Sequence, residues 1–260
     1  MQHRHSDREM YFWEQSVTSE KYFIPFIEKF KNITVDTEML EIGCGDGGNL
    51  LPFVKRNCKV TAVDRATSRI EKAREFFTGH GYKVHLVQAD IFDVTDIGLF
   101  DIILMNDVIE HIHDKALLLE ILKKLLKPGG IIFLGFPAWQ MPFGGHQQIC
   151  RNPIISRMPF IHLFPKSIYK LMLITFNERD SIVQELLSIR EARITIEMYR
   201  RLVNRQNFQV LYERFYLINP HYEIKFKLRP VILPRFLGGI PIIRNFFITS
   251  CFSVLKSSNN

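Results

Sequence analysis

Short, mainly apolar segments alternate with stretches of helical periodicity along the first half of the chain. Between the segments, apolar residues recur at helical spacing, as they do from Leu117 to Leu126. Apolar strands separated by helices are typical of a mostly parallel sheet that is covered on both faces. We expect the strands at residues 39–42, 60–63, 84–87, 102–105 and 131–136.

The same periodicity and its flanking residues predict four helices in this half. A leading helix is expected over residues 18–31, and a second begins at Asn49 after a glycine cluster. Ser68 is the expected cap of a third helix that ends near Gly79. A fourth runs from about Lys115 to the breaker Pro128-Gly129-Gly130.

Regular patterning stops after the fifth strand. Residues 137–176 contain five prolines among aromatics and histidines, which indicates an irregular insertion with short helices, often a lid. A helix over 192–205 and strands over 208–218 and 246–255 follow, with a basic, Pro-rich excursion at 219–243. We expect one α/β domain over residues 1–260: an N-terminal helical cap (1–32), a cofactor-binding core (33–136), a lid (137–191) and a C-terminal helix and hairpin (192–260).

Composition indicates a folded protein of the reducing cytoplasm. The chain has 260 residues, of which 47% are apolar and 23% charged, so it can bury a sizeable core. Four widely spaced cysteines without a C-x-x-C pair argue against a disulfide scaffold and a structural zinc site. The polar start lacks the apolar stretch of a secretion signal, and no apolar run is long enough to cross a membrane.

The net charge of +7 is concentrated near the C-terminus, because residues 190–260 hold 12 Lys or Arg and only 4 Asp or Glu. Such a region attracts phosphates, lipid head groups or acidic sugars, although an ordinary solvated face has the same composition. Mixed with aromatic residues, it suits peripheral contact with a membrane surface.

Glycines and acids stand where the strands end, which is where ligands bind in a doubly wound sheet. Gly43, Gly45 and Gly48 allow a tight turn and close approach of backbone to a cofactor, and Asp64 is placed to accept both ribose hydroxyls. These features suit NAD or an adenosine-containing cofactor. Glu41 would repel a pyrophosphate but suits an ammonium and a sulfonium, and Asp90 can accept from an adenine amine. The set therefore favours a cationic adenosine ligand.

With these residues the sequence resembles the class I S-adenosylmethionine (SAM) methyltransferases. The resemblance covers about residues 38–136 in five ordered motifs: 40–47, 63–64, 88–91, 100–111 and 126–130. It implies a Rossmann-like, doubly wound, seven-stranded sheet with an antiparallel pair of last strands. It also implies SAM as the cofactor, bound by Glu41, Gly43, Cys44, Gly45, Asp64, Arg65, Asp90, Ile91, Asn106 and Asp107.

The segment Asp107-Val-Ile-Glu-His resembles the branch that methylates quinone rings and other small molecules on oxygen. An oxygen acceptor must lose a proton, and histidine suits that role. His146, in a glycine-flanked loop, is the first candidate for the base and His111 is the alternative. Glu110 with His111 is a possible part of a divalent metal site, although no metal is the favoured expectation. Aromatic and apolar acceptor walls are expected from Trp139, Met141, Phe143, Phe160 and Phe164.

The sequence thus predicts a SAM-dependent O-methyltransferase with a small-molecule, lipid-linked or glycan acceptor. Two alternatives stay open. An RNA methyltransferase would use the basic C-terminus, but no nucleic-acid-binding module is recognisable, so nucleic acid is not the expected partner. A non-catalytic SAM-binding protein would bind the cofactor without turnover. Neither the oligomeric state nor the identity of the acceptor follows from the sequence.

Overall fold

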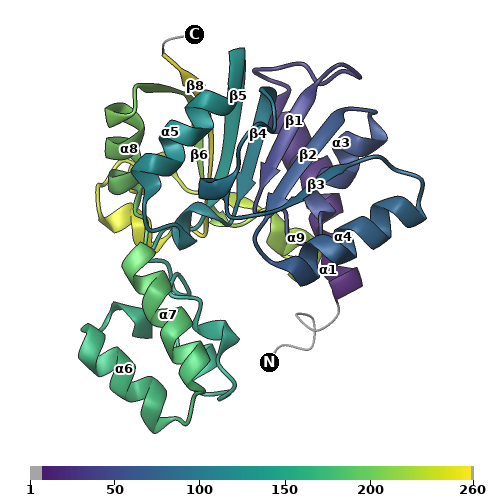
Figure 1. Cartoon of the computed structure of the whole chain (residues 1–260). Coiled ribbons are helices and arrows are strands. Elements are labelled where there is room, and N and C mark those ends of the chain that lie inside the picture. Colours follow the sequence, from purple (N-terminus) through teal and green to yellow (C-terminus); the bar gives the residue numbers. More distant parts are fainter. Residues whose placement is uncertain (1–7, 259–260) are drawn as a thin grey trace.

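The computed structural model of the chain describes residues 8–258 and is organised around a single eight-stranded sheet (Figure 1). The strand order is β3-β2-β1-β4-β5-β8-β6-β7. Strands β1 to β5 are parallel, and β8 runs antiparallel to both β5 and β6. The strands are β1 Glu38–Ile42, β2 Lys59–Asp64, β3 His85–Gln88, β4 Phe100–Asn106, β5 Leu126–Phe136, β6 Phe208–Ile218, β7 Val231–Ile232 and β8 Ser250–Ser257.

Alternation along the central strands divides the core into two layers. On β1, Leu40 and Ile42 face one layer and Met39 faces the other, as the period of two in a strand requires. Helices α5 (Lys115–Leu125) and α8 (Ile196–Arg205) cover the first face. The second face is covered by α1 (Arg8–Thr18), α2 (Ile24–Ile27), α3 (Leu51–Lys55) and α4 (Thr67–Gly79). The expected doubly wound α/β sheet is therefore confirmed.

The last strands confirm the expected antiparallel pair and correct its details. The sheet has eight strands rather than seven, because the two-residue β7 pairs with the outer edge of β6. The final strand begins at Ser250 rather than residue 246, since residues 243–246 form a 3-10 turn. Pro128-Gly129-Gly130 lies inside β5 because α5 already ends at Leu125 and passes directly into the strand.

The N-terminal helices differ most from expectation. Helix α1 begins at Arg8 and continues through a π-helical turn, Ser19–Phe23, into the short α2, so the helix expected at 18–31 begins ten residues earlier and ends at Ile27. Residues 1–7 of the expected cap, and the polar start, lie outside the described residues. Ser68 is within α4, whose N-cap is Ala66.

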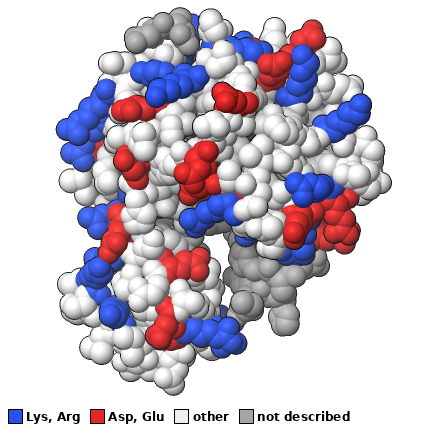
Figure 2. All heavy atoms as spheres, in the orientation of Figure 1, with Lys and Arg blue, Asp and Glu red and all other residues white. Residues whose placement is uncertain are grey.

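Residues 137–192 form a lobe that projects from the sheet (Figures 1 and 2). It contains three 3-10 turns (Gln147–Ile149, Ile155–Arg157, Ile161–Leu163) and the helices α6 (Lys166–Thr175) and α7 (Asp180–Ala192). Part of the lobe has its own apolar core, in which Ile155, Tyr169, Leu173 and Leu186 are fully buried. The lobe is therefore a small packed unit rather than a loose loop.

Two further features bear on the sequence predictions. All four cysteines are free and buried. Within residues 8–258, the helices are too short or too polar for any of them to cross a bilayer.

Candidate active site

The site lies where the strand order reverses. From β1 the chain builds outward through β2 and β3 and then returns to place β4 on the other side of β1. A small crevice, lined by Asn49, Asn106 and Asp107 among others, lies at the carboxyl ends of β1 and β4, which is the usual ligand position in this architecture. Residues that follow β1, β2, β4 and β5 meet there.

The glycine turn after β1 is fixed by hydrogen bonds to the end of β2. Gly43 N donates to Val63 O (2.8 Å), and Gly45 N donates to the Asp64 carboxylate (2.8 Å). Both glycines have positive φ, +68° and +57°. A Cβ on Gly43 would lie 2.4 Å from Cγ2 of Val108, so glycine is required for both its backbone conformation and the close approach. Asp64 thus holds the turn at the place expected for the ribose.

Glu41 is a buried carboxylate with one oxygen unpaired. Its Oε1 accepts from Asn49 Nδ2 (2.9 Å), while Oε2 has no hydrogen-bond partner among the described residues. Burial, reinforced by the charge of Asp64, raises the pKa of Glu41 to about 8 despite the bond from Asn49. A ligand ammonium would satisfy this carboxylate, so the residue fits the methionyl end of SAM and would not fit a pyrophosphate.

The other expected cofactor residues line the same end of the sheet. Asp90 caps the 3-10 turn Ile91–Asp93, accepting from Phe92 N (3.1 Å), and Ile91 is buried beside it. Arg65 is exposed directly after Asp64. Cys44 is buried within the glycine turn, and burial raises the pKa of its thiol. Cys44 is therefore suited to packing rather than to nucleophilic chemistry.

Asn106 ends β4, Asp107 follows it, and both line the crevice. Asn106 Nδ2 donates to Asp107 Oδ2 (2.8 Å), and Asp107 N donates to Gly135 O (2.8 Å) on β5. Asp107 adopts a positive φ of +55°. These bonds fix the side-chain oxygens of Asn106 and Asp107, which can accept hydrogen bonds, at the point where β4 and β5 end.

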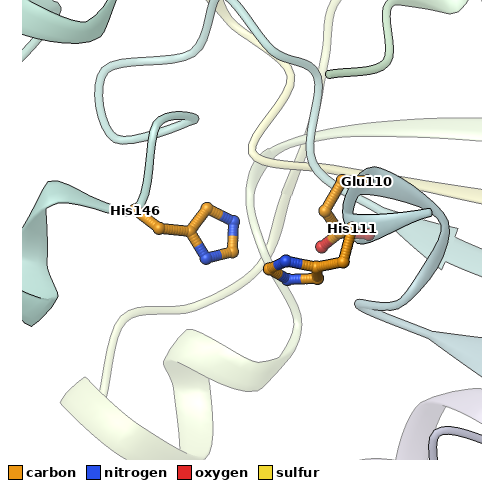
Figure 3. A group of neighbouring side chains, drawn as sticks. All are labelled: Glu110, His111 and His146. Atoms are coloured by element: carbon orange, nitrogen blue, oxygen red, sulfur yellow. The ribbon is translucent and has the colours of Figure 1, made fainter. Parts of the chain in front are cut away.

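Two histidines and a glutamate come together beside this corner (Figure 3). Glu110 and His111 belong to the short turn Ile109–His111 after β4, and His146 approaches from the loop after β5. The His111 and His146 ring centroids are 4.8 Å apart and the rings are nearly perpendicular (83°). The two histidines are 35 positions apart in the sequence, and the structure places them side by side.

Burial determines the charge of this group. It lowers the pKa of His146 to about 3 and that of His111 to about 4, so both rings are neutral at pH 7. Glu110 is buried with neither oxygen hydrogen-bonded to a described residue, and burial followed by repulsion from Asp107 raises its pKa well above the usual value. One ligand atom from each of Glu110, His111 and His146 lies within 4.8 Å of the others, close enough for small rotations to bring them around a divalent cation.

A cavity of about 160 Å³ adjoins the cluster. Met141 and Phe143 form part of its wall, as expected from the sequence. Phe160 and Phe164 do not line it, since both are on the surface, and Trp139 is buried against His162. Other lining residues were not predicted: Tyr11 of α1, Asn219, and His221, Tyr222 and Lys225 of α9 (His221–Phe226). These come from segments with no local signal of a site.

The fold and the strand-end residues define the class of this domain. Residues 40–132 match the protein-family model described as a methyltransferase domain. With its fold and strand-end residues, this stretch resembles the class I methyltransferases, which use SAM as their cofactor.

Particular relatives can be compared with the chain. Over 107 residues it is 31% identical to the ubiquinone biosynthesis O-methyltransferase of Rickettsia conorii, covering 41% of this chain and 37% of that protein. Over 114 residues it is 30% identical to the Rickettsia canadensis protein of the same name, covering 44% and 48%. The match therefore spans less than half the length of either relative.

Solved structures resemble the chain along most of its length. A SAM-dependent methyltransferase from Clostridium acetobutylicum aligns with a TM-score of 0.57 and 12% identity, covering 95% of this chain and 91% of that one. The magnesium protoporphyrin IX methyltransferase of Synechocystis PCC 6803, solved with bound S-adenosylhomocysteine (SAH), aligns with a TM-score of 0.55 and 12% identity, covering 94% and 84%. At such identities the likeness shows the fold alone.

Proposed function

We propose that this protein transfers the methyl group of SAM to an oxygen atom of a small molecule. The observation that carries the proposal is the position of His146 and His111. His146 lines the cavity together with Asp107 and Glu110, and the centroid of the His111 ring lies 4.8 Å from that of His146. A sulfonium at the crevice and a hydroxyl at the histidines would be neighbours. The similarity to proteins named ubiquinone biosynthesis O-methyltransferases supports the same reaction type.

Alignment and exclusion of water are the main contributions of the protein to this reaction. In-line transfer moves a methyl group from sulfur to oxygen while the positive charge of the sulfonium is lost, and positioning can supply roughly 7 to 11 kcal/mol. In this proposal Glu41 holds the cofactor ammonium and Asp64 the ribose. Arg65, Asp90, Ile91, Asn106 and Asp107 complete the cofactor site.

The acceptor hydroxyl must lose its proton, and His146 is the proposed base because it lines the cavity and is neutral. The unpaired oxygens of Glu110 favour a second arrangement. In it, Glu110, His111 and His146 hold a divalent cation, which when bound would lower the pKa of a coordinated hydroxyl. The two arrangements differ in whether removal of metal abolishes turnover.

The cavity suggests the chemistry of the acceptor. Met141 and Phe143 offer apolar contacts, and Lys225 brings a positive charge to the same cavity lining. We propose an acceptor with an apolar or aromatic body and an anionic part, which includes lipid-linked and glycan acceptors. Peripheral contact with a membrane through the C-terminal region belongs to the same proposal.

The test is incorporation of labelled SAM methyl groups into fractionated cell extract. Asp64→Ala should weaken SAM binding in calorimetry, whereas His146→Ala should preserve binding and lower turnover at least tenfold. The exposed His85 provides a matched control, and His85→Ala should behave as wild type. Equal labelling by all four proteins would refute the assignment of the site.

Two further measurements separate the alternatives. Loss of turnover in EDTA, restored by Mn²⁺ or Zn²⁺ in wild type but not in Glu110→Gln, would favour the cation. Label in an RNA fraction with steep salt dependence would favour an RNA methyltransferase, and SAM binding without label in any fraction would favour a non-catalytic protein.

A further inference from the structure

The segment between α9 and β8, residues 226–247, presents apolar side chains at the surface. We call it the apolar excursion. Phe236 is 72% exposed and Ile242 is 63% exposed. Single exposed hydrophobic residues are common on protein surfaces, whereas a group of them in one segment indicates an interaction site. Ten large apolar side chains in these 22 residues are exposed: Phe226, Leu228, Val231, Ile232, Phe236, Ile240, Ile242, Ile243, Phe246 and Phe247.

Specific contacts hold the apolar excursion in this position. The carboxylate of Glu197 on α8 accepts from Arg244 (2.7 Å) and from Asn245 Nδ2 (2.7 Å), and Arg244 is itself buried. Leu233 is buried in the main core and its N–H donates to Phe215 O (2.9 Å). The exposed side chains are therefore fixed outward from an anchored backbone rather than left on a loose loop.

The charged residues of the apolar excursion itself are all basic. No Asp or Glu occurs in the sequence after Glu223, whereas Lys227, Arg229 and Arg235 are exposed among the apolar residues. Apolar side chains interleaved with cations alone are the chemistry that anionic lipid surfaces bind.

The apolar excursion is continuous with the lobe and with the cavity. The ring of Phe160, from the lobe, lies 6.3 Å from the ring of Phe246, and Phe160 is exposed. On the other side, Tyr222 and Lys225 line the cavity immediately before Phe226 begins the excursion. The apolar surface therefore extends from the acceptor cavity to the projecting lobe.

We propose that residues 226–247, together with Phe160, dock on an anionic lipid bilayer. The apolar side chains enter the boundary between head groups and acyl chains, and Lys227, Arg229 and Arg235 contact the anionic head groups. A second copy of the chain is a poorer fit, because a symmetric contact between two such surfaces would bring like charges together. The docking deepens the membrane contact proposed above and does not depend on methyl transfer.

Co-sedimentation with vesicles tests the proposal. Wild-type protein should bind vesicles that contain about one-third phosphatidylglycerol in phosphatidylcholine at about 0.15 M salt, and bind phosphatidylcholine alone at least tenfold more weakly. The double variant Phe236→Ser/Ile242→Ser should bind the anionic vesicles at least tenfold more weakly. Lys227→Glu/Arg229→Glu should remove the preference for anionic lipid, since each cation contributes roughly fivefold.

The control variant Val35→Ser/Leu99→Ser removes two exposed apolar side chains just before β1 and β4, at the amino ends of the central parallel strands. It should bind vesicles as wild type does. Thermal melting checks that every variant is folded. Absence of binding by wild type, or equal binding by folded Phe236→Ser/Ile242→Ser, overturns the proposal. So does a wild-type dimer in light scattering that Phe236→Ser/Ile242→Ser converts to monomer, because the surface would then be an interface between copies.

Discussion

Replacement of Gly43 by alanine tests whether the turn after β1 is fixed by packing as well as by backbone conformation. The substitution forces a non-glycine residue to φ +68°, which costs about 1–2 kcal/mol. It also places Cβ 2.4 Å from Cγ2 of Val108, and overpacking of this kind costs about 1–3 kcal/mol more. We expect Gly43→Ala to lower the free energy of unfolding by about 2–5 kcal/mol.

Gly81 provides the matched control, because its φ is +71° but nothing lies within 4 Å of the position that a Cβ would take. Gly81→Ala should therefore show only the backbone cost of about 1–2 kcal/mol. Denaturant unfolding of both variants measures the difference, and SAH calorimetry should show weaker binding for Gly43→Ala alone. In Gly43→Ala/Val108→Ala the contact is relieved, so part of the stability should return. Equal destabilisation by Gly43→Ala and Gly81→Ala would refute the role of Val108.

Three other substitutions test contacts that hold the helices and the lobe to the sheet. Burial alone would raise the pKa of Glu197, but hydrogen bonds from Asn245, Ile242 N and Arg244 lower it to about 2. The contribution of Glu197 to the free energy of unfolding is therefore fully present above the pKa of an unfolded glutamate, and it is lost as the pH falls toward 2. Glu197→Ala should therefore cost about 2 kcal/mol in denaturant unfolding at pH 7 and much less near pH 2. Tyr199→Phe removes a buried hydrogen bond from the Tyr199 hydroxyl to Ser253 Oγ (2.6 Å) and should cost about 1 kcal/mol in the same assay. Tyr82 is partly exposed, and Tyr82→Phe is the control. An equal cost for the two variants would show that the bond to Ser253 does not stabilise the fold. Lys115→Met leaves the Ile112 and Ala192 carbonyls without their ammonium donor, so amide exchange at the end of α7 should accelerate; unchanged exchange would show that the lobe is held elsewhere.

Local signals account for the parts of the site that the sequence could predict. The glycine turn and Asp64 follow short apolar strands, and parallel strands bring their carboxyl ends to one edge. The meeting of His111 and His146 has the same origin, because each follows one of two neighbouring strands, β4 and β5. The resemblance to a known fold implied that β4 and β5 are neighbours. It did not give the distance between the His111 and His146 rings, which depends on the conformation of the loop after β5.

Other parts had no local signal. The leading helix of the predicted N-terminal cap begins at Arg8 rather than near residue 18, because the buried residues of α1 include Glu14, Ser16 and Thr18 and no apolar stripe marks its start. Lys225 reaches the cavity only because the segment after β6 folds back over the sheet edge, which tertiary packing decides. Pro128 was taken as a helix stop, although α5 ends three residues earlier, at Leu125, and Leu126 already begins β5.

The separate apolar core of the lobe gives the chain a modular way to diversify. Tyr169 and Leu186 pack within the lobe rather than against the sheet, so substitutions there affect little of the stability on which the nucleoside pocket depends. Met141 and Phe143, which line the cavity, lie on the segment that leads into this unit. Descendants of this chain could therefore acquire new acceptors by altering the lobe while the cofactor end stays unchanged.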